Sequence, residues 1–309
     1  VDKDFNAVEA CKFGLLLKLL EDEDNLSISH PALPNIDNNI QFGNSLIESN
    51  QTTQENQEAI NPFDFGEIKF DVIVGNPPYL ATEHIKKFTP AELPIYKEIF
   101  DSAYKQFDKY FVFIERGFGL LKPNGILGFI IPSKFAKVGA GKKLRGFLSD
   151  KTAVKKIVSF GANQIFQDKT TYTCLLILTK NQKEVLRYHE VGDLNDWKSK
   201  NYVIEYDNVE FSELNEETWV LMPNDLKPIF ISVSEQSIEL EQLIGSENIF
   251  NGIQTSKNEI YVQVAERDDE DYFYFTYNDE EFKVEKVLTR PYFQTSTGID
   301  NLNTYLLLQ

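Results

Sequence analysis

The chain has 309 residues, of which 42% are hydrophobic and 26% are charged, and its formal net charge is −17. This length allows one large domain and part of a second, in the composition of an ordinary globular protein. No apolar run reaches transmembrane length and no signal peptide opens the chain, so we expect a cytoplasmic protein without a membrane partner. Cys11 and Cys174 lie in apolar segments and are expected to be reduced core residues. The three histidines are scattered, so no metal site is expected.

The charges are distributed unevenly along the chain. A strongly acidic protein is a poor match for DNA, because affinity for DNA comes largely from neutralising phosphates. Between residues 134 and 156, however, eight basic residues face a single acid, Asp150. This stretch is either a basic stripe that contacts DNA or a solvated helix face. The candidate DNA-contacting residues are Lys134, Lys142, Lys143, Arg145 and, further along, Lys169.

The first residues predict the end of a strand followed by a helix. Val1-Asp2 is typical of a strand end, and apolar residues recur at helical spacing over residues 6–20. An acid between a strand and a helix either binds ribose hydroxyls, as in nucleoside-binding α/β folds, or caps the helix. Residues 40–47 predict a short strand that ends at Gly43-Asn44, and residues 49–67 predict a polar surface loop.

Residues 70–79 are the most informative stretch. The apolar residues 72–74 predict a short, buried parallel strand. The two prolines that follow must end it, because proline has no N–H for a sheet ladder and restricts the residue before it. The strand therefore runs into a stiff loop that presents the Asn76 amide, the Pro77 carbonyl and the Tyr79 ring.

These groups suit a flat heterocycle that carries an amino group. The side-chain oxygen of Asn76 and the carbonyl of Pro77 can each accept one N–H of that amino group. The Tyr79 ring can stack on the heterocycle, which is worth roughly 1–3 kcal/mol per nucleic-acid base. The carboxyl ends of strands are where open α/β sheets bind ligands. The structural alternative is that the prolines only end a strand and that Tyr79 packs on the surface.

Further along, helical and apolar stretches alternate. An irregular segment to about residue 93 is followed by a helix through residue 122. The later elements are a strand over 126–133, a basic helix over 141–150, strands over 154–160 and 171–179, short polar strands over 185–220 and a helix over 224–244. Apolar strands that alternate with helices predict an α/β fold with a mostly parallel sheet covered on both faces.

Residues 70–79 closely resemble the catalytic motif of the gamma-class N6-adenine DNA methyltransferases, and the resemblance runs through most of the chain. It implies a Rossmann-like sheet, mostly parallel with one antiparallel strand, that binds S-adenosylmethionine and an adenine flipped out of double-stranded DNA. Asn76, Pro77 and Tyr79 are then the catalytic positions, and Tyr79 also stacks on the target base. The same resemblance implies cofactor-binding roles for Asp2 at the ribose, for Asn44 at the adenine and for Asn76. The family usually has an aspartate where this chain has Asn44.

The family uses a second aromatic residue to cover the other face of the base. Phe166 matches that position, in the loop between the last two predicted strands of the sheet. The alternative role for Phe166 is core packing under the loop. Tyr172 is then the second candidate.

Residues 248–261 resemble the opening of a TaqI-like target-recognition domain, which follows the methyltransferase domain in type IIG restriction–modification enzymes. We therefore expect a methyltransferase domain over 1–220 and the beginning of an α+β target-recognition domain over 221–309. The sequence lacks the Gly-rich turn with which such methyltransferases hold the cofactor. We expect a portion of a longer polypeptide, truncated at its N-terminus and weak or inactive alone, whose remainder is a candidate place for a nuclease domain.

The expected function is thus site-specific DNA adenine N6-methylation within a restriction–modification enzyme. The same four-residue motif also serves protein-glutamine and RNA methyltransferases, which usually lack a long C-terminal recognition domain. A non-catalytic DNA-recognition scaffold on a degenerate methyltransferase fold is a further alternative. Asn44 and the missing Gly-rich turn support that scaffold interpretation.

Overall fold

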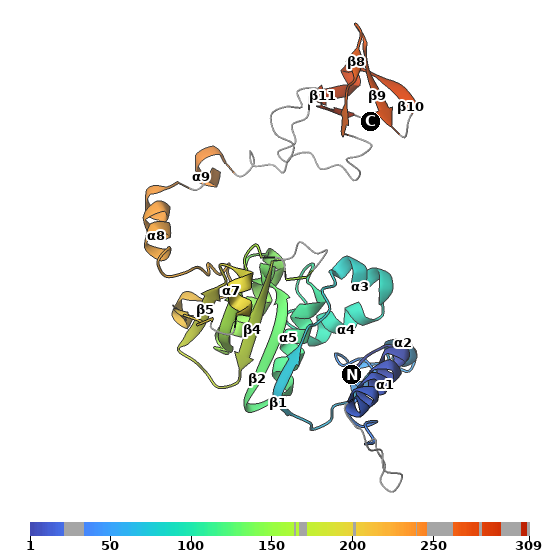
Figure 1. Ribbon diagram of the computed structural model, residues 1–309, viewed down its shortest axis with the longest axis vertical. Helices are drawn as coiled ribbons and strands as arrows, with labels where there is room; N and C mark the ends of the chain where they lie inside the picture. The colour runs from blue at the N-terminus through green and yellow to red at the C-terminus, as the bar shows by residue number, and fades with distance from the viewer. Residues whose placement is uncertain are drawn as a thin grey trace. The chain divides into compact units, whose positions relative to one another are not determined.

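The computed structural model describes residues 1–21, 34–163, 165–166, 172–199, 202–238, 240–245, 262–277, 280–291 and 304–307. The chain divides into two compact units, Val1–Val233 and Ser234–Gln309 (Figure 1). The sequence placed its domain boundary at 220/221, and the role of the second unit in target recognition stays a prediction.

The first unit is built on one six-stranded sheet with the strand order β1-β2-β4-β3-β5-β6. Its strands are β1 (Phe70–Gly75), β2 (Leu121–Pro132), β3 (Val154–Ser159), β4 (Thr173–Thr179), β5 (Val185–Glu190) and β6 (Asp207–Glu210). β1 pairs with β2 in parallel, and β3 pairs with β5 in parallel. β4 lies between β2 and β3 and runs antiparallel to both. The predicted α/β class with a sheet whose strands mostly share one direction is confirmed.

The sheet has one more antiparallel strand than the sequence predicts. β6 pairs with β5 in antiparallel fashion, so β4 and β6 both oppose the other four strands of this sheet. β6 falls within the polar stretch 185–220, where short strands were expected but their pairing was not. Alternation along a strand indicates which of its side chains face the core, and it does not indicate whether the strand runs parallel or antiparallel to its neighbour.

β1 is an edge strand, which corrects the prediction that its apolar residues are buried. In this sheet β1 pairs with β2 alone, and Val72 and Val74 are 59% and 77% exposed. Ile73 is partly buried and packs against the core. The prediction failed because Val72 and Val74 point to the same face of the sheet, which is open beside β1, and an apolar run does not report whether anything covers that face.

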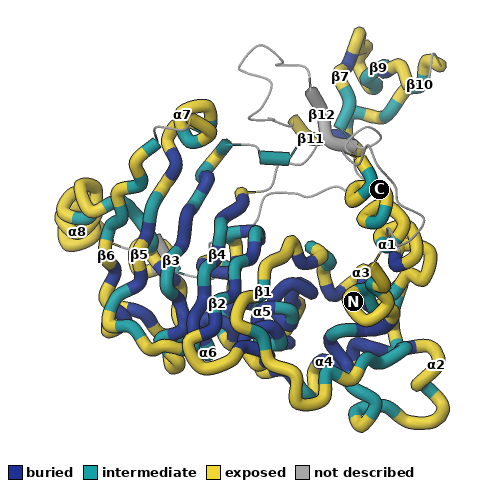
Figure 2. The backbone as a smooth tube through the Cα atoms, turned by 60° about the horizontal axis from the view of Figure 1, so that its bottom comes forward, coloured by how far each residue is buried: buried dark blue, intermediate teal, exposed yellow. Residues whose placement is uncertain are grey.

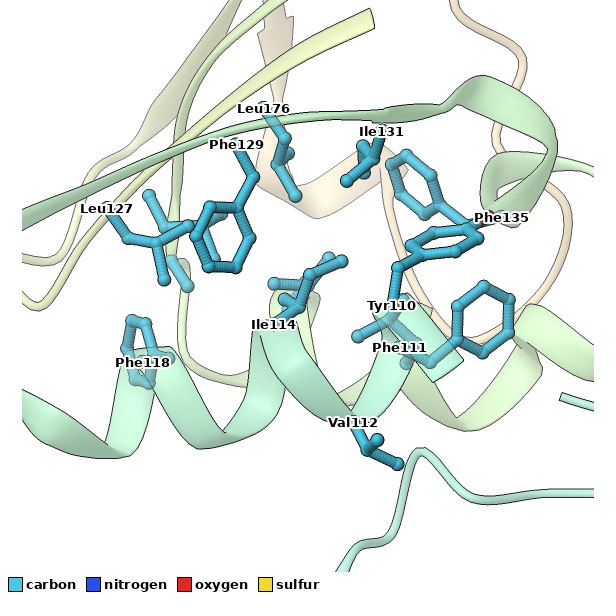
Figure 3. Packing of buried hydrophobic residues seen from close by; sticks show 14 of the residues in the cluster. Tyr110, Phe111, Val112, Ile114, Phe118, Leu127, Phe129, Ile131, Phe135 and Leu176 are labelled. Carbon is cyan, nitrogen blue, oxygen red and sulfur yellow. The ribbon is translucent and has the colours of Figure 1, made fainter. Parts of the chain in front are cut away.

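Helix α5 (Lys109–Leu120) forms the main core contact with the sheet. Its side chains Tyr110, Ile114 and Phe118 recur every four residues and point towards β2, where Leu127 and Phe129 meet them (Figure 3). All five are buried, and burying a large apolar side chain stabilises a fold by about 1.5–3 kcal/mol. The buried stretches in Figure 2 accordingly gather in β2, β3 and β4.

The remaining helices of this unit are α1 (Phe5–Leu20), α2 (Gln57–Ile60), α3 (Thr82–Phe88), α4 (Glu92–Ile99), α6 (Lys142–Asp150) and α7 (Leu194–Lys198). Helix α8 (Lys227–Gln236) crosses into the second unit. The predicted irregular segment before residue 93 thus contains α3. The predicted helix through residue 122 is two helices, α4 and α5, separated by residues 100–108.

Helix α1 exposes most of the apolar residues that its helical spacing predicts to be in the core. Val8 is the buried residue of α1, whereas Leu15, Leu19 and Cys11 are exposed. The prediction that Cys11 is a core residue is therefore wrong, because no described part of the chain covers this face of α1. Cys174 on β4 is buried, as expected, and both cysteines are free. No helix among the described residues is long and apolar enough to cross a membrane.

The second unit contains helix α9 (Leu240–Ile244) and two small sheets. One sheet joins β8 (Arg267–Asp268), β9 (Tyr272–Tyr277) and β10 (Glu280–Glu285) in antiparallel order. The other joins β7 (Val262–Val264), β12 (Thr304–Leu307) and β11 (Thr289–Pro291). The stretch 248–261, on which the resemblance to a target-recognition domain rests, lies outside the described residues.

The buried side chain of Arg145 holds together the segment that follows β2. This segment forms two short 3-10 helices, η2 (Ser133–Ala136) and η3 (Gly139–Gly141). Nη1 of Arg145 donates to the carbonyls of Phe135 (2.7 Å) and Val138 (2.8 Å). Its Nε donates to the carbonyls of residues 216 and 217, at 3.1 and 2.7 Å. One guanidinium therefore joins α6, the turn after β2 and the segment 215–219.

Variants at two glycines of η3 test the packing around Arg145 as a matched pair. A methyl group on Gly141 would overlap the carbonyl of Phe135 and lie 2.8 Å from Nη1 of Arg145, whereas one on Gly139 would meet nothing within 4 Å. We expect Gly141→Ala to lower the free energy of unfolding by about 1–3 kcal/mol, the usual cost of overpacking. Gly139→Ala should be close to neutral. Chemical denaturation of both variants measures this, and equal stability of the two would contradict the packing described here.

Candidate active site

The corner that follows β1 is fixed by hydrogen bonds made just beyond its prolines. Asn76 and Pro78 are exposed, Pro77 is buried and Tyr79 is half-buried. The carbonyl of Leu80 accepts a bond from the backbone N–H of Lys109 (2.8 Å). Thr82 donates from its N–H (3.0 Å) and its hydroxyl (2.6 Å) to the carbonyl of Phe107. These bonds replace the ladder that the prolines cannot make.

Tyr79 is held at both ends of its side chain. Its hydroxyl donates to the carbonyl of Ile130 on β2 (2.9 Å), and its ring meets Tyr110 edge to face, with centroids 6.0 Å apart. Burial raises the pKa of Tyr79 to about 12, so its hydroxyl stays protonated near neutral pH. Tyr79 therefore presents an aromatic plane and carries no charge.

A groove of about 980 Å³ lies on one side of the corner, between β1 and the first residues of the chain. We call it the Asn76 groove. Its polar lining includes Asp2, Lys3, Asn44, Asn76 and Lys109, and Pro77 also lines it. Parallel bridges of Asp2 with Phe42 and of Asn44 with Pro62 set the far wall. The predicted strand over 40–47 is reduced to these bridges.

A second hollow, of about 810 Å³, lies on the Tyr79 side of the corner, and we call it the Tyr79 pocket. Its lining comes mainly from the carboxyl ends of β2, β3 and β5 and from the segment 219–221 that Arg145 helps to hold. Besides Tyr79 these residues include Ser133, Lys134, Ser159, Tyr172, Tyr188, Glu190 and Trp219. The pocket thus combines aromatic planes with a few polar groups, which suits a flat, partly polar ligand.

The structure distinguishes the two possible roles of the N-terminal acid. Asp4 caps α1, because its carboxylate accepts from the N–H groups of Asn6 (2.8 Å) and Ala7 (3.4 Å). The Asp2 carboxylate accepts from the N–H of Asp4 (2.8 Å) and lies in the lining of the Asn76 groove. Asp2 is thus free of the capping role, and ribose binding stays a prediction for it.

The two candidates for the second aromatic residue lie in different surroundings. Phe166 is half-buried and does not belong to the lining of the Tyr79 pocket, whereas Tyr172 is exposed and does line it. The backbone carbonyl of Tyr172 accepts a bond from the N–H of Ser133 (2.9 Å), which ties the start of β4 to the end of β2. Residues 167–171, between these two aromatics, lie outside the described residues.

Most of the predicted DNA-contacting residues already have acidic or carbonyl partners. Lys134 pairs with Asp108 (2.5 Å), Lys142 with Glu217 (2.7 Å) and Lys143 with Glu216 (3.5 Å). Arg145 is 2% exposed and serves four carbonyl oxygens, so it is a structural residue and not a phosphate ligand, which corrects that prediction. Lys169 lies outside the described residues.

Reasoning from the sequence missed a buried polar cluster behind the Asn76 groove. Its centre is the carboxylate of Glu92, which contacts Lys3, Asn44, Tyr96 and Lys109. Glu92 lies one residue from the end of the segment predicted to be irregular, where no periodicity marks it as buried. Among the described residues, no group of three or more His, Cys, Asp or Glu side chains could hold a metal ion.

Comparisons with known proteins assign the chain to a family. Residues 1–166, more than half of the chain, match the family model of the Eco57I restriction-modification methylase. The chain is 49% identical, over 99% of its length, to the type II restriction enzyme and methyltransferase RM.Eco57I of Escherichia coli, and it spans 31% of that protein. It is 30% identical to the type II methyltransferase M.BstVI of Geobacillus stearothermophilus, over 63% of this chain and 37% of the relative.

Among solved structures, the type IIG restriction endonuclease BpuSI aligns with 46% of this chain and 19% of its own, at 17% identity and a TM-score of 0.36. The chain spans about a third of the length of the two curated relatives named above. On the strength of the family match over residues 1–166, the chain belongs to the Eco57I family of restriction-modification methylases.

Proposed function

We propose that this chain is the methyltransferase portion of a restriction–modification enzyme and methylates the N6 amino group of adenine in double-stranded DNA with S-adenosylmethionine. The observation that carries this proposal is the position of the corner between two hollows. Asn76 and Pro77 line the groove on one side, and Tyr79 lines the pocket on the other. A transfer between two bound molecules needs such a junction, because the reacting atoms must meet at about 3–3.5 Å.

The Asn76 groove carries polar groups that suit the cofactor. Asp2 offers a carboxylate for ribose hydroxyls, and Asn44 offers an amide for the edge of an adenine. When bound there, S-adenosylmethionine supplies an electrophilic methyl group. The exposed Asn76 side chain lines the same groove and so lies on the side from which that group must approach.

The Tyr79 pocket fits the base. An adenine leaves the duplex at a cost of a few kcal/mol, and stacking on Tyr79 returns part of that cost. The side-chain oxygen of Asn76 and the carbonyl of Pro77 accept the two hydrogens of its amino group. With both hydrogens held, the nitrogen lone pair turns out of conjugation with the ring and towards the groove. The amino group is neutral, so the chain needs no general base before transfer, and the surplus proton leaves to water afterwards.

The DNA itself is proposed to reach the pocket past Lys134, which lies in the pocket lining and is about half exposed. On binding DNA, Lys134 would exchange Asp108 for a phosphate as its partner. Lys142 and Lys143 would likewise exchange their glutamate partners for phosphates. The second unit is proposed to read the target sequence. The long segment beyond residue 234 favours this DNA function over protein-glutamine or RNA methylation.

The direct test is methylation of duplex DNA by the full-length protein with S-adenosylmethionine, followed by sequencing of the modified bases. The proposal predicts N6-methyladenine within one short sequence. Modification of cytosine, of RNA or of protein glutamine would overturn it. Tight DNA binding with no methylation of any substrate would instead support the non-catalytic scaffold.

Replacing Asn76 should remove catalysis and leave the fold intact. Asn76 is exposed, so Asn76→Ala creates no cavity, yet it removes one of the two acceptors of the amino group. We expect the rate of methylation to fall by at least about 100-fold, as for loss of one preorganised hydrogen-bonding group at a reacting centre. The control is Asn208→Ala, another exposed asparagine outside both hollows. An Asn76→Ala variant with normal activity would remove the corner from the mechanism.

Two variants of Tyr79 separate the role of its ring from that of its hydroxyl. Tyr79→Phe keeps the stacking plane and loses only the bond to the carbonyl of Ile130, so its activity should stay within a few-fold of the wild type. Tyr79→Ala removes the plane, which should weaken capture of the base by roughly 5- to 150-fold, the equivalent of 1–3 kcal/mol. Steady-state kinetics with duplex DNA measures both. A Tyr79→Ala variant as efficient as Tyr79→Phe would contradict stacking.

A further inference from the structure

The buried carboxylate of Glu92 connects three segments that are far apart in the sequence. Its Oε1 accepts from the ammonium of Lys3 and from Nδ2 of Asn44 (3.2 Å). Its Oε2 accepts from the hydroxyl of Tyr96 (2.6 Å) and the ammonium of Lys109 (3.0 Å). Lys3, Asn44 and Lys109 all line the Asn76 groove, whereas Glu92 is 1% exposed and lies behind them. One carboxylate thus holds three polar side chains of the groove wall.

Glu92 is ionised in this setting. Burial alone would raise the pKa of Glu92, but the ammonium groups of Lys109 and Lys3 and the Tyr96 hydroxyl outweigh burial and leave that pKa below its ordinary value. Burial lowers the pKa of the Lys109 ammonium, and the Glu92 carboxylate opposes that shift by favouring the charged form. Buried charge networks of this kind contribute little net stability, because desolvation offsets the attraction. A role in geometry explains the cluster better than a role in stability.

Glu92 fixes the amide of Asn44 in one orientation. Nδ2 of Asn44 points to Glu92, and Oδ1 of Asn44 accepts from the N–H of Leu46 (3.1 Å), so the amide cannot flip without losing both bonds. Asn44 is 2% exposed, lines the groove and also interacts with the Tyr96 hydroxyl, so its amide is held in one orientation at the groove wall. An aspartate at position 44 would instead set two carboxylates against each other at hydrogen-bond distance.

The same cluster reaches the corner through Lys109. The side chain of Lys109 binds Glu92, and its backbone N–H binds the carbonyl of Leu80, the residue after Tyr79. A shift of Lys109 therefore moves both the groove wall and the end of the corner. Asp108, the neighbour of Lys109, lines the Tyr79 pocket instead, so adjacent residues of this segment serve the two hollows.

We infer that Glu92 is a positioning residue for S-adenosylmethionine: it orients the Asn44 amide and holds the Lys109 and Lys3 ammonium groups at the wall of the Asn76 groove. This inference rests on the proposed function. Glu92 touches neither the methyl group nor the base, and it acts through the three side chains that it holds.

A charge-exchange cycle tests the inference in the full-length protein. Glu92→Gln keeps the size of the side chain but presents an NH₂ group or a neutral oxygen to Asn44, Lys3 and Lys109. We expect the KM for S-adenosylmethionine to rise by about tenfold or more, the usual effect of losing hydrogen bonds to a charged group, and this rise to exceed both the fall in kcat and the rise in the KM for DNA. Asn44→Asp should likewise raise the KM for S-adenosylmethionine, because its carboxylate faces that of Glu92.

The double variant Asn44→Asp/Glu92→Gln restores one carboxylate and one amide at the same two positions. We expect its KM for S-adenosylmethionine to fall below that of either single variant. Glu115→Gln is the matched control, because the Glu115 carboxylate binds the backbone N–H groups of Asp101 (3.2 Å) and Ser102 (2.9 Å) and lies outside the groove lining. Its KM should match that of the wild type. Thermal unfolding of every variant accompanies the kinetics.

The outcomes separate this inference from the proposed function. A wild-type protein that neither binds S-adenosylmethionine nor methylates DNA would overturn both. An active wild type with an unchanged KM in Glu92→Gln would overturn the inference alone, as would a double variant no better than the worse single one. Glu92→Gln alone could fail to fold. In that case, recovery of folding and of cofactor affinity in the double variant would support the inference. A double variant that also fails to fold would assign Glu92 a role in stability instead.

Discussion

The backbone bonds between Leu80–Thr82 and Phe107–Lys109 hold the candidate site together. β1 pairs with β2 as far as Gly75, but the two prolines that follow cannot extend this ladder, so the direction of the chain beyond Gly75 has to be fixed by other bonds. The bonds from Lys109 to Leu80 and from Thr82 to Phe107 supply that constraint immediately after Tyr79. With both ends of the corner fixed, Asn76 is directed to one hollow and Tyr79 to the other.

Basic residues gather at particular sites of this protein, although the net charge of the whole chain is negative. The net charge of −17 would repel a polyanion, but at the Asn76 groove the buried carboxylate of Glu92 is matched by the ammonium groups of Lys3 and Lys109. The basic stretch 134–156 serves two purposes. Arg145 is buried and braces the wall of the Tyr79 pocket, whereas Lys134 lies in the pocket lining and is about half exposed. Charge distribution, more than net charge, decides which molecules such a surface can admit.

The sequence predicted the class of the fold and the corner itself, because both depend on local features. An apolar run, two prolines and an alternation of strands and helices are visible without knowledge of neighbours. Several features that depend on neighbouring segments were missed or wrong: the exposure of Val72 and Val74, the exposure of Cys11 and the burial of Arg145. Glu92 was missed for the same reason, since its four partners come from positions 3, 44, 96 and 109. No local pattern connects those positions.

The central claim is that the corner after β1 presents a base on one side to a methyl donor on the other. The most direct measurement is a structure of the full-length protein with duplex DNA and S-adenosylhomocysteine, the product form of the cofactor. The account predicts an extruded adenine against Tyr79, its amino nitrogen within hydrogen-bond distance of Asn76 and the Pro77 carbonyl, and the cofactor product between Asp2 and Asn44. A cofactor product bound outside the Asn76 groove, or a base extruded away from Tyr79, would contradict it.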